Sequence, residues 1–321
     1  MPDCNFPIDL VYLWVDGSDP AWCERKNKFL REAGAAEQSL AVPERWQDNN
    51  ELLYSLRGVE MFVPWIHHIY LVTDGQRPSW LVPSHPRLTV VDHRDFIPQE
   101  YLPLFSSDTI ESFVPDIPGL SEHFLLANDD IFFGRPLSPR RFFTAEGTPQ
   151  MQVKRLYSRD FADDEALCQS LYQDNVFASR VRANRLVYER FGVKYNWEAA
   201  HVIDPYRKSF MQEVLSDPQL ASAWETARRQ RFRSPLALQR IIFSLYDASK
   251  GRTKLLDTRR FRELKRLFCP SRLPLLLCKP ADLAKVRRIR PEMFCYYVGD
   301  YYQELAEFFR SYFPQKSSFE K

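Results

Sequence analysis

Four short apolar segments in the first half of the chain each run directly into a polar, mostly acidic cluster. Helical segments separate them, and strands that alternate with helices predict a mostly parallel sheet. The carboxyl ends of parallel strands meet at one edge, where ligands of such sheets bind. We therefore expect the four clusters to converge. The strands are expected at residues 8–15, 68–73, 88–91 and 123–127, followed respectively by Asp16, Asp74, Asp92 and Asn128-Asp129-Asp130.

The expected fold is α/β and Rossmann-like, with a mostly parallel sheet flanked by helices and a largely helical, basic C-terminal part. Helices are expected at residues 22–36 and 52–61, the second opened by Asp48-Asn49-Asn50-Glu51, which suits an N-cap and an acidic first turn. The sequence pattern changes after Phe143, because the segments that follow are polar and predicted to be helical. We place a boundary at residue 150, with 1–150 as an α/β core and 151–321 as a mainly helical part of one integrated unit.

The net charge of +2 hides an asymmetry between the two halves. Residues 1–150 carry 12 basic and 22 acidic side chains, whereas residues 151–321 carry 32 and 20. An acidic half can hold a divalent cation, and a basic half can meet phosphates or anionic lipid. Two solvated surfaces of opposite sign are the simpler explanation, which charge alone favours. The run from Arg228 to Arg233 could serve as a nucleic-acid patch, but the acidic half argues against a nucleic-acid partner.

Several classes of protein do not fit the sequence. No stretch approaches the roughly 18 to 20 apolar residues that span a bilayer, and the first residues lack a basic segment followed by an apolar run, so we expect no secretory signal. The six cysteines form no CxxC pair, which favours a reducing compartment. Neither a phosphate-binding P-loop, nor a dinucleotide fingerprint, nor a Gly-x-Ser-x-Gly elbow is present.

Individual residues carry chemical hypotheses of different strength. The carboxylates and amide of Asn128-Asp129-Asp130 suit Mg²⁺, which can bridge the phosphates of a nucleotide-sugar, although an Asx-rich turn explains them equally simply. His201 is a candidate base or a hydrogen-bonded structural residue. Arginine guanidinium groups match phosphate oxygens, but each arginine taken singly is better explained as a surface or salt-bridge residue. The candidate arginines are Arg57, Arg207, Arg231 and Arg233.

Four blocks of sequence, in this order, resemble one family. They are Ile8–Pro20, Asp48–Asp130, His201–Ser234 and Phe294–Glu320, and they resemble the Stealth family. This family comprises bacterial capsular-polysaccharide phosphotransferases and the catalytic part of the animal enzyme that tags lysosomal proteins with N-acetylglucosamine-1-phosphate. Some positions depart from its pattern. Ser106 and Thr109 stand where Asn and Ala are usual, the Pro two residues after His201 is missing, and Tyr296–Gly299 intervene before Asp300, which weakens inference about that residue.

The resemblance implies transfer of a sugar-1-phosphate from a UDP-sugar to a glycan hydroxyl, with release of UMP, in capsule or exopolysaccharide synthesis. It implies that residues 1–150 bind nucleotide-sugar and metal, and that residues 151–321 complete the site. The implied cofactor is Mg²⁺ or Mn²⁺. Implied metal ligands are Asp129, Asp130 and Asp300, and implied catalytic residues are His201, Arg233 and Asp130. Implied substrate-binding residues are Asp16, Gly17, Ser18, Asp19, Asn50, Arg57, Asp74, Asp92, Arg94, Asn128 and Arg207.

Two other functions stay open at this point: a conventional glycosyltransferase that releases UDP, and a degenerate module that only binds nucleotide-sugar or glycan. The expected partners are a UDP-sugar and a glycan acceptor, which a lipid could carry, and the expected location is the cytoplasm or the inner face of the inner membrane. The aromatic stretch Phe294–Phe313 is either an interfacial helix or a helix packed on the core. The oligomeric state is open, with a homodimer among the options.

Overall fold

The computed structural model describes residues 4–33, 46, 48–156, 175–258, 275–277, 280–296 and 302–321. Its centre is a five-stranded sheet in the order β3-β2-β1-β4-β8. The first four of these strands are parallel, and β8 runs antiparallel to β4 at one edge. The strands are β1 (Ile8–Leu13), β2 (Ile69–Thr73), β3 (Leu88–Asp92), β4 (His123–Asn128) and β8 (Asp204–Arg207). The expected mostly parallel α/β fold is confirmed.

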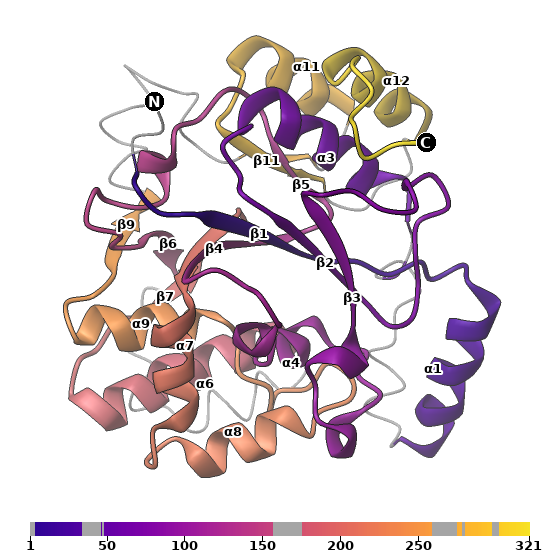
Figure 1. Cartoon of the computed structure of the whole chain (residues 1–321). Coiled ribbons are helices and arrows are strands. Elements are labelled where there is room, and N and C mark those ends of the chain that lie inside the picture. Colours follow the sequence, from indigo (N-terminus) through magenta and orange to yellow (C-terminus); the bar gives the residue numbers. More distant parts are fainter. Residues whose placement is uncertain are drawn as a thin grey trace.

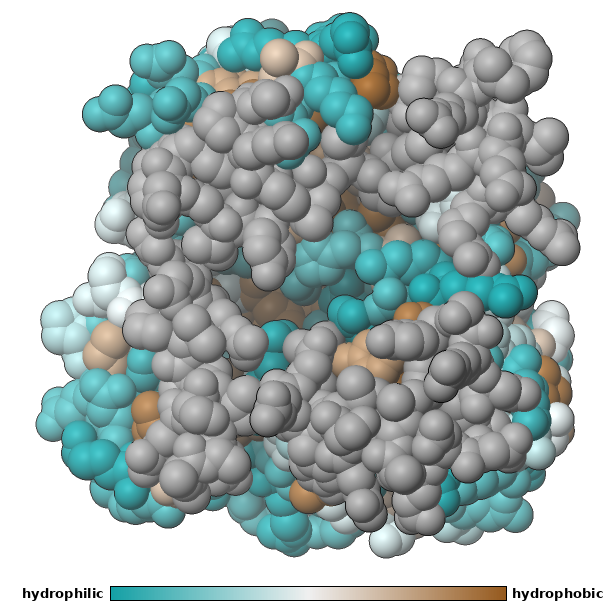
Figure 2. Space-filling view, turned by 180° about the vertical axis from the view of Figure 1, so that it is seen from behind, coloured by the Kyte–Doolittle hydropathy of each residue, from teal (hydrophilic) through white to brown (hydrophobic). Residues whose placement is uncertain are grey.

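Helices cover both faces of this sheet (Figure 1). On one face lie α3 (Glu51–Phe62), α11 (Pro280–Ile289) and α12 (Tyr302–Tyr312). On the other lie α4 (Ser107–Glu111), α6 (Asn175–Phe191), α7 (Lys208–Ser216), α8 (Ala221–Arg228) and α9 (Ile241–Ser249). The first helix is α1 (Pro20–Glu32). A space-filling view from behind shows a hollow across the middle of the molecule, lined partly by hydrophilic residues (Figure 2).

The strands are apolar on both faces because both faces are covered. In β1, Leu10 and Tyr12 pack in a core with Leu56 of α3, whereas Val11 faces a second core that contains Phe243 of α9. All four side chains of β1 and α3 named here are fully buried. Burying each such side chain contributes about 1.5–3 kcal/mol to the stability of the fold. The packed sheet therefore fixes the positions of the strand ends.

Two small sheets join the halves of the chain. One has the order β10-β11-β5 and the other β7-β6-β9. The C-terminal part is largely helical, as expected, and also contributes short strands to all three sheets. Their bounds are β5 (Ile131–Phe133), β6 (Gln150–Arg155), β7 (Trp197–Ala199), β9 (Lys254–Asp257), β10 (Leu275–Leu277) and β11 (Met293–Tyr296).

The aromatic stretch from Phe294 to Phe313 packs on the core. Phe294 belongs to strand β11, and α12 begins only at Tyr302. Phe309 of α12 and Phe313, which directly follows this helix, are 1% and 0% exposed and pack against Phe132 of β5. Of the two alternatives for this stretch, the structure therefore has the helix whose aromatic face is buried in the protein. Within the described ranges, every helix is too short or too polar to span a bilayer.

Candidate active site

The strand register brings the polar clusters to one edge of the central sheet. Leu13 of β1 lies opposite Asn128 of β4 on one side and Val72 of β2 on the other. Thr73 of β2 lies opposite Asp92 of β3. Parallel pairing therefore aligns the four carboxyl ends, as the sequence pattern predicts, and the acidic residues that follow the strands share this edge.

The turn after β1 is tied to the turn after β2. Asp16 Oδ1 accepts hydrogen bonds from the Ser18 backbone at 2.8 Å and from Ser18 Oγ at 2.6 Å. Asp19 is the N-cap of α1, because its carboxylate accepts from the Ala21 amide at 2.9 Å. Gln76 Nε2 donates both to the Asp16 carbonyl at 2.9 Å and to Asp19 Oδ2 at 3.0 Å. The turn thus holds one strand end against the next.

Gly17 lets a second segment approach this turn. Its amide donates to the Trp46 carbonyl at 2.6 Å. A Cβ at this position would lie 2.2 Å from the same oxygen, so any larger residue would push the two backbones apart.

Three carboxylates gather between the start of α3 and the end of β4. Burial raises the pKa of Glu51 to about 7 and also raises the pKa of Asp48. Burial, and then the charges of Asp130, Glu51 and Asp48, hold the pKa of Asp129 well above its ordinary value. Such mutual repulsion among anions is relieved by a cation. From the sequence, Asp48 and Glu51 are assigned to the start of a helix, and it is not predicted that they lie close to Asp129.

The start of α3 shows why the N-cap assignment was incomplete. Asn50 is the cap residue, but its φ of 65° is left-handed and its side chain makes no capping hydrogen bond. Asp48 instead accepts from the Asn50 amide at 2.9 Å, and Glu51 accepts from Asn49 Nδ2 at 2.8 Å. Both carboxylates thus accept hydrogen bonds within the turn, and both also lie close enough to Asp129 to raise its pKa.

Asp130 meets a histidine and a cysteine from the second half of the chain. His201, which precedes β8, places Nε2 3.9 Å from Asp130 Oδ2. Cys295 of β11 donates its thiol to the same oxygen at 3.3 Å. The other oxygen, Asp130 Oδ1, is buried and has no hydrogen-bond partner in the described part of the chain. Asp130 and His201, both predicted from the sequence as site residues, thus lie side by side, and Cys295, which is not among the predicted site residues, joins them.

A buried ion cluster lies behind these residues, centred on Arg240. Its guanidinium pairs with Glu111 of α4 at 2.9 Å and with Asp204 of β8 at 2.8 Å, and it donates to Asn128 Oδ1 at 3.3 Å. All three charged residues are at most 4% exposed. Burial raises the pKa of Glu111 to about 7 and that of Asp204 to about 6, and Arg240 partly opposes both shifts.

Arg233 is connected to this cluster through α4. Its Nε lies 3.9 Å from Asp108 Oδ2, and Asp108 accepts a long hydrogen bond from Gln239 at 3.4 Å. Asp108 and Glu111 are three residues apart on one helix and so share a face. A chain of contacts therefore runs from Arg233 through α4 and Arg240 to Asn128. Sequence reasoning did not name Asp108, Glu111, Asp204 and Arg240 as site residues, because their partners lie far away in the sequence.

Three further predicted residues, Asp74, Asp92 and Arg94, form ion pairs at the carboxyl edge. Asp74 pairs with Arg25 of α1 at 3.0 Å. Arg94 donates from Nε and Nη2 to the two oxygens of Asp92 at 2.9 and 2.8 Å, and this bonding keeps the pKa of Asp92 below its ordinary value. The side chain of Arg94 is 70% exposed, so it can also meet a ligand. Asp300 lies outside the described residues.

Two predicted phosphate-binding arginines lie elsewhere. Arg207 aligns with His123 at the amino end of β4 and pairs with Glu122 at 2.8 Å. Arg57 of α3 donates to both oxygens of Glu320 at 2.8 and 2.7 Å. Neither guanidinium joins the acidic cluster, because each is held by a carboxylate of its own. Both guanidinium groups therefore have carboxylate partners away from the acidic cluster, and their role in substrate binding stays a prediction from the sequence.

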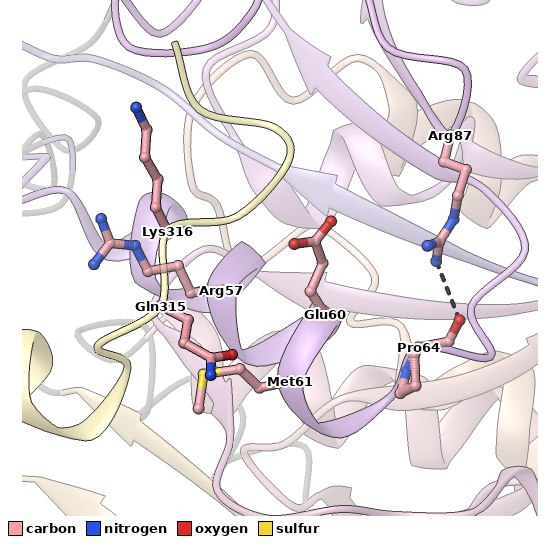
Figure 3. A pocket seen from close by; sticks show the side chains of 7 residues that line it. All are labelled: Arg57, Glu60, Met61, Pro64, Arg87, Gln315 and Lys316. Atoms are coloured by element: carbon pink, nitrogen blue, oxygen red, sulfur yellow. Dashed lines mark hydrogen bonds between the residues drawn. The ribbon is translucent and has the colours of Figure 1, made fainter.

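Arg57 also borders a pocket of about 320 Å³ (Figure 3). Arg87 lies in its wall and donates to the backbone of Pro64 and Ile66, next to the amino ends of β2 and β3. This pocket is thus at the opposite end of the strands from the acidic cluster. Its lining consists of Arg57, Glu60, Met61, Pro64, Arg87, Gln315 and Lys316.

The fold and the site define a class: an α/β protein with carboxylates, an imidazole and arginines at the carboxyl edge of a mostly parallel sheet, a set suited to phosphorylated ligands. Matches to models of known protein families narrow this class to one family. Stealth protein CR1, conserved region 1, matches residues 6–34, and Stealth protein CR2, conserved region 2, matches residues 45–151. Together with the relatives described next, these matches show that the chain belongs to the Stealth family, as the sequence blocks predict.

The curated relatives are polysaccharide phosphotransferases. The chain is 30% identical over 353 residues to exopolysaccharide phosphotransferase cps2G of Lactiplantibacillus plantarum, covering 98% of this chain and 97% of that protein. It is 37% identical over 334 residues to exopolysaccharide phosphotransferase SCO6023 of Streptomyces coelicolor, covering 99% of this chain but 53% of that protein. The chain thus spans about half the length of the latter relative.

Among solved structures, the galactosyltransferase LgtC in complex with donor and acceptor sugar analogs is similar over 97% of both chains. The identity is 10% and the TM-score 0.45.

Proposed function

We propose that this protein transfers a sugar-1-phosphate from a UDP-sugar to a hydroxyl of a glycan, in the synthesis of a capsule or exopolysaccharide. The donated sugar is a hexose or an N-acetylhexosamine. The observation that carries the proposal is the convergence of Asp129, Asp130 and His201 at the carboxyl edge, in a chain whose relatives are named polysaccharide phosphotransferases. Residues 1–150 bind the donor, and residues 151–321 supply His201 and Arg233.

The donor set at this edge fits a divalent cation. Among the residues that the structure describes, the buried Oδ1 of Asp130 has no hydrogen-bond partner, and the pKa of Asp129 is raised by burial and by neighbouring carboxylates, so both mark a place where a cation would be stabilised. Asp129 and Asp130 would hold Mg²⁺ or Mn²⁺, with Asp300 as the third ligand that the family resemblance implies. When bound, such an ion supplies charge neutralisation for the pyrophosphate and its leaving group.

The chain's own groups then have distinct roles in the transfer. The acceptor hydroxyl oxygen attacks the sugar-proximal phosphorus, the bond from that phosphorus to the bridging oxygen breaks, and UMP leaves. His201 Nε2 takes the hydroxyl proton, and the neighbouring Asp130 carboxylate stabilises the imidazolium that forms. Arg233 faces the phosphate charge, steadied by Asp108.

The test is to identify the nucleotide that leaves. Purified protein with a UDP-sugar, Mg²⁺ and acceptor glycans should release UMP. Asp130→Asn and His201→Ala should each lower turnover by about 10²–10⁴-fold, the range for loss of an acid–base group or a charge-stabilising group. Glu24→Gln, on the exposed face of α1, is the matched control and should turn over normally. Near-normal rates in either site variant would remove that residue from the mechanism.

A further inference from the structure

Asp130, His201 and Cys295 form a cluster of three different donor atoms. They come from three separate elements: the turn after β4, the segment before β8, and strand β11. Their ligand atoms, one carboxylate oxygen, one imidazole nitrogen and one sulfur, all lie within 4.8 Å of one another. The sulfur is 3.3 Å and the nitrogen 3.9 Å from Asp130 Oδ2.

These separations are close to those of a tetrahedral metal site. Zinc binds oxygen or nitrogen at about 2.0 Å and sulfur at about 2.3 Å, so that adjacent tetrahedral ligands lie about 3.3–3.8 Å apart. The 3.3 Å between sulfur and carboxylate oxygen already matches this range, whereas the 3.9 Å to the imidazole nitrogen, and the sulfur-to-nitrogen separation of at most 4.8 Å, would shorten as His201 turns toward an ion. Three protein ligands would leave the fourth position open to solvent or substrate.

The burial of the three donors is graded. Cys295 is 1% exposed, while the side chains of Asp130 and His201 are 32% and 44% exposed. The thiol therefore lies on the buried side of the cluster, and the imidazole lies on its solvent-exposed side. An ion from solvent can reach the cluster on the side of His201.

The chemistry of this set differs from that of an all-oxygen magnesium site. Magnesium prefers carboxylate, carbonyl and water oxygens, whereas thiolate and imidazole select zinc and the neighbouring late transition metals. One carboxylate and one thiolate would also neutralise a doubly charged ion. Binding would release the Cys295 thiol proton to solvent.

We propose that Asp130, His201 and Cys295 form a binding site for a thiophilic divalent cation of the Zn²⁺ type, and that its occupation blocks the enzyme. The block follows because the ion takes the nitrogen lone pair with which His201 would accept the acceptor's proton, and occupies the Asp130 carboxylate that would otherwise hold Mg²⁺. This second half rests on the proposed function, whereas the binding of the ion does not.

Cobalt reports the binding directly, because a thiolate bound to Co²⁺ gives a sulfur-to-metal charge-transfer absorption. Titrating the full chain with Co²⁺ should produce this absorption, and Zn²⁺ should abolish it by displacement. Cys295→Ser should remove it. Cys23→Ser is the matched control, since the Cys23 thiol donates to the Gly17 carbonyl at 3.0 Å in another part of the edge, and it should keep the absorption. His201→Ala should weaken Co²⁺ binding by about tenfold or more.

The kinetic arm separates this proposal from the proposed function. Zn²⁺ should inhibit UMP release in the presence of Mg²⁺, and Cys295→Ser should need about tenfold more Zn²⁺ to halve its own rate, whatever that rate is. Cobalt absorption without any UMP release would leave the site standing and overturn the proposed function alone. No absorption in the unmodified protein, or an absorption that survives Cys295→Ser in a variant that melts like its parent, would overturn the metal site and leave Cys295 as a hydrogen-bond donor only.

Discussion

At the scale of single residues, Arg240 shows how one buried charge can organise a site. It holds α4, β8 and the end of β4 together through Glu111, Asp204 and Asn128. A buried arginine is costly to desolvate, and it is stable here because two carboxylates surround it. Its loss would leave two anions facing each other at the strand ends, beside the segment that carries His201.

Arg240→Met should therefore destabilise the protein in a pH-dependent way. The pKa values of Glu111 and Asp204 are already raised to about 7 and about 6, and removing the cation raises them further. Both carboxyls then bind protons at low pH, which relieves the repulsion. We expect a loss of about 3–5 kcal/mol at about pH 8 and clearly less at about pH 5, measured by urea unfolding.

The control for this measurement is Arg229→Met. Arg229 is more than half exposed and pairs with Glu225 one turn away, so its loss should cost no more than about 0.5 kcal/mol at either pH. Equal losses at both pH values in Arg240→Met would contradict the assignment of the raised pKa values to this cluster.

Two arginines of the same type test whether sequence or structure assigns their roles correctly. Arg57 is held by Glu320 and fixes the last residues of the chain to α3, whereas Arg233 lies beside Asp108 in the site network. Arg57→Ala should lower the melting temperature and leave kcat/KM of the folded enzyme nearly unchanged. Arg233→Ala should lower kcat/KM by about 10²-fold or more with little change in melting temperature. A large loss of kcat/KM in Arg57→Ala, with none in Arg233→Ala, would instead support Arg57 as the phosphate ligand.

At the scale of elements, α12 is part of the core. Phe313→Ala removes a side chain that is 0% exposed and in contact with Phe132, and should cost about 3–5 kcal/mol of unfolding free energy. Glu307→Ala, on the exposed side of α12, should change the free energy of unfolding by no more than about 0.5 kcal/mol. A second measurement is flotation with liposomes. Because the aromatic face of α12 is buried in the protein, this helix should not bind the intact protein to liposomes. A stable Phe313→Ala variant that no longer floats with liposomes, when the parent does, would favour the interfacial alternative.

The strands and their convergence could be predicted from sequence because they depend on local patterns. Each apolar run is bounded by turn residues, and the observed strands differ from the expected ones by at most two residues, as where β1 ends at Leu13 rather than at residue 15. Asp130 and His201 could be named because both lie in recognisable blocks. Phe294, in contrast, lies in a stretch that the sequence predicts to be helical, because its strand forms by pairing with the distant Phe132 of β5 and with Leu275 of β10.

The rest depended on contacts between distant residues. Arg240 meets Glu111 across 129 positions, and Cys295 meets Asp130 across 165. A sequence pattern carries no signal for such pairs, so Arg240 went unnoticed and Cys295 was only one letter of a block. The same cause explains Arg57, whose partner Glu320 lies 263 positions away. Local pattern therefore predicts where a site lies, and long-range pairing decides which side chains serve it.

At the scale of the whole molecule, the two halves of opposite charge share their sheets. Strand β8, from the basic half, completes the sheet that begins in the acidic half, and β11 pairs with β5. The carboxylates of the first half thereby face His201, Arg233 and Arg240 of the second. In the proposed reaction, the acidic half would supply the carboxylates that hold a cation, and the basic half would supply the groups that meet phosphate and accept a proton.

The most direct test of this account is mass spectrometry of the acceptor glycan after reaction with a UDP-sugar and Mg²⁺. Phosphoryl transfer predicts an acceptor that has gained one sugar and one phosphate, joined through a phosphodiester. An acceptor that has gained the sugar alone, with UDP as the other product, would contradict it and make the protein a conventional glycosyltransferase.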